Sequence, residues 1–254
     1  MSTVAKAISL LDLLGSGAPE VALADLARRA GFDKATTRRL LVSLNAHGLV
    51  EQDETTRLYR LGAGIARLAL MREAQFPFLR MAAPVVEALA AETGETVHLS
   101  EYSKRGLITV QVIESAKANR VSVQLGDVLP MHATASGIAF LAFTEERIRE
   151  AVLAGPLPAF TPHTIGKVET LVEHIAAARA RGHSTGSQGY EEGVLSVAAP
   201  ILGADGFAIG AIAIAAPRVR IQKGDIERHG ASVAAAAREI GERLFGRLPG
   251  QKRA

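Results

Sequence analysis

The sequence contains no cysteine, which excludes a disulfide framework, a thiolate metal site and a cysteine nucleophile. It also lacks tryptophan, and aromatic residues make up only 4% of the chain. Alanine is abundant instead, and 48% of the residues are hydrophobic. So many small apolar side chains indicate closely packed helices rather than a large aromatic core.

Long apolar runs are also missing. No stretch reaches about 18 uninterrupted apolar residues, so the sequence predicts no membrane span. The most apolar run, 207–216, has the length of a strand. The first 17 residues lack the basic start and long apolar stretch of a secretory signal, and Asp12 interrupts them. We therefore expect a cytoplasmic protein.

The sequence has little net charge, but its small positive excess lies in one part of the chain. The net charge is +3: residues 1–80 carry 11 basic and 8 acidic residues, and residues 81–254 carry 18 of each. Five basic residues fall between Arg28 and Arg39, against the single acidic Asp33. A local basic patch on a neutral remainder predicts one module that binds a polyanion.

Signatures of metal and cofactor sites are absent from the sequence. The seven histidines form no pair at i and i+4 and no HExxH motif, so no helix-borne metal site is predicted. Gly62-Ala63-Gly64 lacks the third glycine and the preceding buried strand of a dinucleotide-binding loop. We expect no metal, no cofactor and no catalytic residue.

The segment 33–49 has the pattern of one short amphipathic helix. Asp33 is a good N-cap, because its carboxylate can accept a hydrogen bond from a free N–H of the first turn. Gly48 suits the end of the helix, where the backbone takes a positive φ. The buried side is marked by three leucines at helical spacing: Leu40, Leu41 and Leu44.

The opposite side of this helix is basic. Four residues point away from the leucines at about 100° per residue: Ala35, Arg38, Arg39 and Val42. Thr36 lies on the flank near the first turn, and Thr37 leans back toward the leucines. Two arginines with small and hydroxyl side chains suit a groove lined with phosphates and base edges. Alone they would equally suit a solvated helix face, so the neighbouring segments decide.

Those neighbours predict a helix-turn-helix. Amphipathic helices are expected over 4–14 and 21–30, and Gly31 ends the second. A turn of two or three residues then leads into the helix that begins at Asp33. Two helices joined by so short a turn, the second basic, form a helix-turn-helix.

A β-hairpin is expected next, from strand-like runs over 49–52 and 57–61 around the polar tip 53–56. After a helix-turn-helix such a hairpin is a wing, and its acidic tip disfavours deep insertion into the minor groove. Arg57, Tyr59 and Arg60 are placed to touch the DNA backbone. The predicted DNA contacts are Arg28, Lys34, Ala35, Thr36, Thr37, Arg38, Arg39, Arg57 and Tyr59.

The rest of the chain predicts an α+β domain. A helical connector spans 62–78, and Pro77 marks a break. Strands are expected over 96–102, 107–114, 120–125, 194–202 and 207–216. Helices are expected over 85–92 (with Pro84 in its first turn), 132–143, 144–154, 168–181 and 223–245. Hairpin-linked strands interleaved with helices indicate an antiparallel sheet flanked by helices.

Three segments resemble the IclR family of bacterial transcriptional regulators. They are LADLARRAGFDKATTRRLLVSLNAHGLVEQDETTRLYRLG (23–62), GDVLPMHATASGIAFLAF (126–143) and RGHSTGSQGYEEGVLSVAAPILGADGFAIGAIAIAAP (181–217). The first alone would indicate only a winged helix. The other two are what distinguish this family from other winged-helix families.

The resemblance implies an α+β protein of two domains. Residues 1–62 form a winged helix-turn-helix, 63–80 a linker helix, and 81–254 a GAF-like domain for effector binding and oligomerisation. It also implies a homodimer or a tetramer that is a dimer of dimers. Such a regulator binds a pseudo-palindromic operator of a catabolic operon, commonly as a repressor, and responds to a small organic acid.

The family places its effector between the 131–143 region and the last two strands. The sequence supports this, since a helix that begins near His132 presents free N–H groups suited to a carboxylate. Thr134 and Ser136 add hydroxyls, although capping and small-residue packing explain these two equally well. The predicted ligand contacts are Met131, Thr134, Ala135, Ser136, Gly186, Val194, Ser196, Ala213 and Ala215.

The expected pocket is more apolar than in some members of the family. Where those members have an acidic residue after the long helix, this chain has Gly186. Where they have small hydroxyls on the last strand, it has Ala213 and Ala215. Our hypothesis is therefore an effector larger and more apolar than a small keto acid, such as an aromatic acid.

Two other functions compete with this interpretation. Residues 182–186, GHSTG, fit the G-x-S-x-G nucleophile elbow of serine hydrolases. A helix precedes this motif where the elbow needs a strand, the only downstream histidine is His229, and no oxyanion segment is present. The other alternative is a DNA-binding protein that responds to no ligand.

Overall fold

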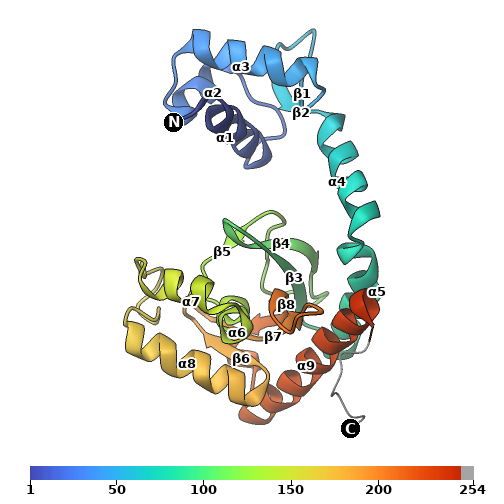
Figure 1. Ribbon diagram of the computed structural model, residues 1–254, viewed down its shortest axis with the longest axis vertical. Coiled ribbons are helices and arrows are strands. Elements are labelled where there is room, and N and C mark those ends of the chain that lie inside the picture. The colour runs from blue at the N-terminus through green and yellow to red at the C-terminus, as the bar shows by residue number, and fades with distance from the viewer. Residues whose placement is uncertain (247–254) are drawn as a thin grey trace. The chain divides into compact units, whose positions relative to one another are not determined.

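The computed structural model describes residues 1–246, which fold as two compact units, one over Met1–Pro77 and the other beginning at Phe78 (Figure 1). The predicted linker, 63–80, is divided at Pro77. Helix α4 (Ala63–Gln75) belongs to the first unit and α5 (Phe78–Thr93) to the second. Within residues 1–246, no helix is long and apolar enough to cross a bilayer.

The first unit is the predicted winged helix-turn-helix. Its remaining elements are α1 (Thr3–Gly15), α2 (Leu23–Ala30), α3 (Lys34–Ala46), β1 (Val50–Gln52) and β2 (Tyr59–Leu61). Gly31 ends α2 with φ 69°, in the left-handed region that favours glycine. The strands β1 and β2 pair antiparallel, with Val50 opposite Leu61. The helix pair and the hairpin therefore form as the sequence predicts.

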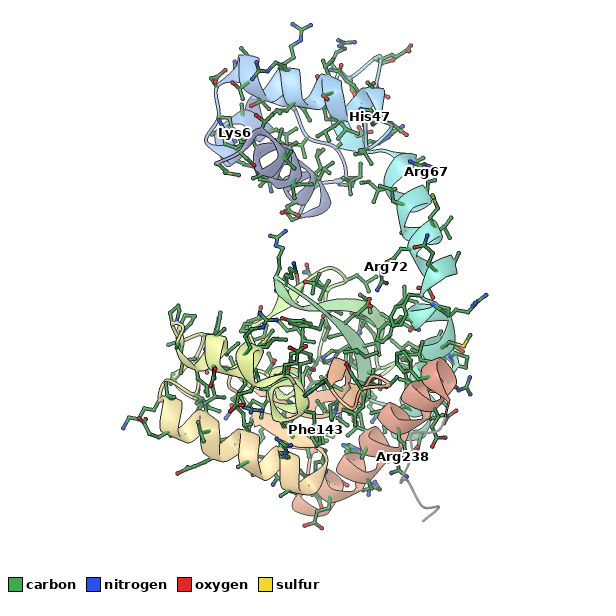
Figure 2. All side chains as sticks on the ribbon, viewed as in Figure 1. Lys6, His47, Arg67, Arg72, Phe143 and Arg238 are labelled. Atoms are coloured by element: carbon green, nitrogen blue, oxygen red, sulfur yellow. The ribbon has the colours of Figure 1, made fainter. Side chains whose placement is uncertain are left out.

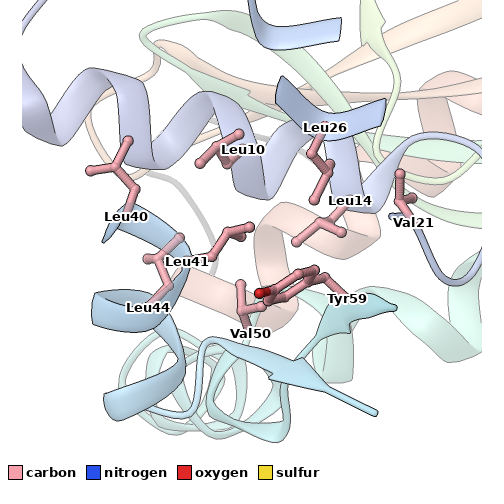
Figure 3. Close-up of a cluster of buried hydrophobic side chains, with 9 residues drawn as sticks. All are labelled: Leu10, Leu14, Val21, Leu26, Leu40, Leu41, Leu44, Val50 and Tyr59. Carbon is pink, nitrogen blue, oxygen red and sulfur yellow. The ribbon is translucent and has the colours of Figure 1, made fainter. Parts of the chain in front are cut away.

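Leucines from all three helices form the core of this unit (Figure 3). Leu10, Leu26 and Leu41 are fully buried. Tyr59 of β2 packs in the same cluster, and its backbone exchanges two hydrogen bonds of 2.8 Å with Val21. The hairpin is thus tied to the segment before α2, which fixes the wing against the helices.

The second unit is a six-stranded antiparallel sheet with helices on both faces. The strands are β3 (Thr96–Ser103), β4 (Gly106–Ile113), β5 (Val128–Leu129), β6 (Ser184–Ser187), β7 (Val194–Leu202) and β8 (Ala208–Pro217). The helices are α6 (Ala135–Phe143), α7 (Glu146–Leu153), α8 (Val168–Arg181) and α9 (Lys223–Phe245), with the 3₁₀ turn η1 (Arg218–Arg220) before α9. The strand order is β5-β4-β3-β8-β7-β6.

Helix α6 lies against one face of this sheet, while α5 and α9 cover the other (Figure 1). Four alanines make the closest contact between α6 and the sheet: Ala135, Ala139, Ala198 and Ala213. This contact explains the abundance of alanine, because small side chains let a helix approach a sheet closely. Side chains fill the layer between sheet and helices, with Phe143 of α6 among them (Figure 2).

The predicted elements differ from the structure in five places. Residues 120–125 form no strand but an irregular segment, whereas the sequence predicts neither β5 nor β6. Helix α6 begins at Ala135 rather than at His132, because Thr134 is its N-cap. Pro84 lies inside the 16-residue α5 rather than at the start of a shorter helix.

Candidate nucleic-acid interface and ligand pocket

Helix α3 is held at its start by the residue that the sequence predicts. The Asp33 carboxylate accepts a hydrogen bond of 2.7 Å from the backbone N–H of Thr36. That bond keeps the pKa of Asp33 below its usual value. The Thr37 hydroxyl donates to the Asp33 carbonyl at 2.9 Å. These contacts fix the first turn, and so the direction of the basic side chains that follow.

The outer face of α3 carries exposed cations. Lys34, Arg38 and Arg39 are exposed, and none of them has an ion-pair partner among residues 1–246. Ala35 and Val42 are exposed beside them, Val42 to 59%. An exposed valine on such a face suits contact with a thymine methyl group. The sequence placed Val42 on this face but did not include it among the predicted contacts.

Two of the predicted DNA contacts are wrong, because their side chains are buried. Thr37 is fully buried beneath α3, and Tyr59 is 5% exposed and packs in the core. Thr36 is half-buried. Arg28 is exposed but pairs with Asp25 at 2.6 Å. The burial of Thr37 could be predicted, because helical spacing places it next to the leucines of α3. The inward direction of Tyr59 could not, because it depends on how the hairpin packs against the helices.

The wing presents one exposed cation without an ion-pair partner in the described part of the chain, Arg57. Its φ of 60° is unusual for a non-glycine residue. Asp53 makes the turn by accepting the N–H groups of Thr55 and Thr56, and these bonds lower its pKa. Arg60 pairs with Glu51 and Glu20 instead.

Three other cations of residues 1–77 lack an ion pair with a described residue but are engaged otherwise: Lys6 lies over the Phe32 ring, Arg29 donates to the Ser16 carbonyl, and Arg67 contacts the Met71 sulfur. Among the described residues of this unit, the exposed cations with none of these contacts are Lys34, Arg38 and Arg39 of α3 and Arg57 of the wing.

The second unit contains a cavity of about 330 Å³, within the size range of small-molecule sites. It lies at the start of α6 and is bounded by strands β3, β6, β7 and β8 and by the irregular segment near 121–127. Seven of the nine predicted ligand contacts line it: Thr134, Ala135, Ser136, Gly186, Val194, Ser196 and Ala215.

The other two predicted contacts, Met131 and Ala213, do not line the cavity. Ala213 is fully buried in the alanine contact between α6 and the sheet. Met131 is half-buried and packs against two apolar clusters of this unit. The cavity therefore gives no support to these two residues as ligand contacts, which stay predictions.

One end of the cavity is suited to an anion. Thr134 caps α6 by accepting the Gly137 N–H at 3.0 Å, while the N–H groups of Ala135 and Ser136 have no hydrogen-bond partner among the described residues. A Cβ atom at Gly186 would lie 3.1 Å from the Ala135 nitrogen and 3.3 Å from Ser196 Oγ. Such contacts are tighter than ordinary ones, so glycine lets β6 approach the start of α6 closely, and Gly186, Ala135 and Ser196 together line this end of the cavity.

A buried histidine that the sequence did not single out lines the other side of the cavity. His98 of β3 is 6% exposed, and its Nε2 lies 3.3 Å from Ser136 Oγ. Burial lowers its pKa to about 4, so the imidazole is neutral near pH 7. Strand alternation does place His98 on one face with Thr96 and Ser100, but a core histidine gives the same pattern.

The GHSTG motif does not form a nucleophile elbow. Ser184 lies within β6, paired with Ala198 of β7, and is 1% exposed. Its hydroxyl donates to the Ala135 carbonyl. A nucleophile must stand exposed on a sharp turn after a strand, so this serine is structural and the hydrolase alternative is wrong.

Two family models match the chain. The IclR helix-turn-helix domain matches residues 3–54, and the bacterial transcriptional regulator IclR C-terminal domain matches residues 74–242. The transcriptional repressor IclR of Escherichia coli strain K12 is 29% identical over 243 residues, which cover 94% of this chain and 89% of that protein.

Solved structures agree with these matches. A crystal structure described as an ICLR transcriptional regulator from Silicibacter sp. TM1040 is 39% identical, covers 98% of both chains and has a TM-score of 0.86. An IclR homologue from Microbacterium hydrocarbonoxydans, solved in complex with 4-hydroxybenzoate, has the same fold at 24% identity and a TM-score of 0.82, covering 96% of this chain and 99% of that one.

These matches span both units, so the chain is a DNA-binding regulator with a ligand-binding effector domain rather than an enzyme. The winged helix comes first in the chain and the antiparallel effector domain second, which is the order in which the two family models match. The chain belongs to the IclR family of bacterial transcriptional regulators.

Proposed function

We propose that this protein binds a pseudo-palindromic operator through α3 and represses a catabolic operon until a small organic acid occupies the cavity of its effector domain. The observation that carries the proposal is the face of α3, where Lys34, Arg38 and Arg39 are exposed without an ion-pair partner among residues 1–246. Cations that no internal carboxylate neutralises are available to phosphates and base edges. Because its DNA partner is bacterial, we place the protein in the cytoplasm.

The proposed effector is an aromatic acid. Its carboxylate would lie at the end of the cavity lined by Gly186, against the Ala135 N–H and the Ser196 hydroxyl. Apolar walls such as Val194 and Ala215 would contact a ring. The complex of the Microbacterium homologue with 4-hydroxybenzoate supports a fold able to enclose such a molecule.

The proposed mechanism is linkage between the two ligands. The acid prefers one arrangement of the effector domains, and the operator prefers one spacing of the two recognition helices in a dimer. If the helices that join the domains couple these preferences, acid and operator alter each other's affinity by the same factor. Operator affinity that no acid changes would favour the alternative, a DNA-binding protein without an effector.

We expect Arg38→Ala and Arg39→Ala each to weaken binding to the DNA upstream of the protein's own gene. A phosphate-binding arginine would lower the slope of log affinity against log salt by about one on all sequences. A base-reading arginine would cost about 1–3 kcal/mol and relax specificity at one position. Fluorescence anisotropy across a salt series distinguishes the two.

Arg179→Ala is the matched control for these variants, because Arg179 is an exposed arginine of α8 in the effector domain. Its operator affinity should equal that of the wild type. Wild-type affinity in both α3 variants would mean that this face does not read DNA.

The proposed dimer, or dimer of dimers, is supported by apolar side chains on α4. Leu68 and Met71 are 48% and 51% exposed, one helical turn apart, and no residue of α4 is buried. We expect the double variant Leu68→Asp, Met71→Asp to sediment at a smaller assembly size and to bind the operator more weakly. Ala66→Asp is the control, because it adds a charge without removing an apolar side chain. An unchanged sedimentation profile for the double variant would place the interface elsewhere.

A further inference from the structure

The cavity has polar groups on two sides of the first turn of α6, where Ala135 faces Gly186 and Ser136 faces His98. Ser196 and Gly186 lie on β7 and β6, whereas His98 lies on β3. Ser196 of β7 pairs with Ala215 of β8, and Ala215 pairs with Thr96 of β3. His98 is two residues beyond Thr96 on the same strand. With strands about 4.8 Å apart and about 3.4 Å per residue, the Cα atoms of Ser196 and His98 are about 12 Å apart. Ala215 lines the cavity between them.

The His98 end has unused hydrogen-bonding capacity. The Nδ1 atom of His98 is buried without a partner among residues 1–246. Its Nε2 is 3.3 Å from Ser136 Oγ, which is long for such a bond. Buried polar atoms in native proteins almost always have a partner. The Nδ1 atom has less than 1 Å² of accessible surface and does not face the cavity, so the group that a ligand can meet is the weakly bonded pair of Nε2 and Ser136 Oγ.

The charges around the cavity decide which group suits this end. Among the residues that the structure describes, no lysine or arginine lines the cavity, and the only charged side chains there are the carboxylates of Asp127 and Glu191. A neutral imidazole in a buried position supplies no charge to balance a carboxylate. A hydroxyl fits better, because it can donate to Nε2 or accept from it, whichever tautomer His98 adopts, and can also bond Ser136 Oγ.

We propose, resting on the function proposed above, that the effector has two polar ends, with its acid at Gly186 and an uncharged hydroxyl at the His98–Ser136 pair. His98 is then a specificity-determining residue that selects hydroxylated aromatic acids over their unsubstituted counterparts. A site built to hydrogen-bond a hydroxyl discriminates strongly against the analogue that lacks it, because its own polar groups are left unpaired.

The experiment is titration calorimetry on the full-length protein with matched acids of two lengths. The pairs are benzoate with 4-hydroxybenzoate, and phenylacetate with 4-hydroxyphenylacetate. In at least one pair the wild type should bind the hydroxylated acid at least tenfold more tightly. Ser136→Ala and His98→Phe should reduce that preference to less than threefold by weakening the hydroxylated acid alone. His98→Gln, which keeps a donor and an acceptor, should retain part of it.

The outcomes separate this inference from the function on which it rests. Ser136→Ala removes one oxygen atom, so the test stands even if His98→Phe fails to fold. Equal affinity for both members of each pair in the wild type, or an unchanged preference in Ser136→Ala, would overturn the role of the His98 end and leave an acid effector intact. Binding of none of the four acids would overturn the aromatic-acid effector itself.

Discussion

Replacing Glu95 by glutamine should lower the free energy of unfolding of the effector domain by about 2–4 kcal/mol. Glu95 is only 4% exposed, yet its carboxylate is fully paired. Arg220 of η1 donates to it twice, at 2.8 and 2.7 Å, and Lys117 donates once at 2.7 Å. An amide removes the charge that faces both cations and turns an NH₂ group toward one of them.

The cluster of Glu95, Lys117 and Arg220 joins three distant parts of the chain, so the cost should be cooperative. It links the start of β3, the segment after β4 and the turn η1 after β8. Thr96 then holds the same segment by donating to the Val121 carbonyl at 2.7 Å. Since Val121 lines the cavity, loss of the cluster should also loosen one wall of the pocket.

Urea unfolding followed by circular dichroism measures this loss, and Lys117→Met provides the control. Lys117 is 45% exposed and Arg220 keeps its two bonds without it, so that variant should lose less than about 1 kcal/mol. Equal stability of Glu95→Gln and wild type would mean that the two cations are satisfied by solvent and that the cluster does not hold the segments together.

The sequence predicts the elements that carry their own local signals. Helix α9 occupies the expected range, 223–245, because a long apolar period is joined to a capping box between Gln222 and Asp225. Helix α3 likewise follows from its N-cap and its leucines. Strands β3, β4, β7 and β8 lie within a residue or two of their predicted bounds, since each is a long run of apolar or alternating residues.

The errors occur where a distant contact decides the local structure. Strand β6 is four small or polar residues, and only its pairing with β7 makes it a strand. The segment 120–125 alternates like a strand, but it pairs with no strand of the described chain, and residues 121–124 line the cavity instead. Tyr59 was assigned outward on a hairpin whose inner side is set by contact with Val21.

The candidate pocket could be predicted only in part for the same reason. The resemblance of the sequence to the family predicts that the pocket lies between the start of α6 and the last two strands. Seven of the nine predicted ligand contacts do line the cavity. His98 was missed because its role depends on Ser136, which is 38 residues away in sequence. Hydrogen-bond partners at that separation leave no local pattern to read.

Gly186→Asp should abolish the response to acids while leaving operator binding intact. Gly186 lies in a strand without a positive φ, so the backbone conformation suits any residue, but a Cβ atom would press on Ala135 and Ser196 and cost some packing in every variant. The new carboxylate would lie against the Ala135 N–H and Ser196 Oγ, where the effector acid is proposed to bind. Two carboxylates cannot share those donors, and their repulsion should lower the affinity for 4-hydroxybenzoate by roughly 100-fold, about 2.7 kcal/mol.

Two comparisons separate charge from bulk in this variant. Gly186→Asn fills the same space without a charge, so it should weaken 4-hydroxybenzoate less than Gly186→Asp does. For the neutral 4-hydroxybenzamide, the affinities of Gly186→Asp and Gly186→Asn should differ far less than they do for 4-hydroxybenzoate. Calorimetry gives the affinities, and anisotropy with the upstream DNA gives the response. If Gly186→Asp and Gly186→Asn weaken the acid equally, the cavity end at α6 excludes by size and the effector acid binds elsewhere.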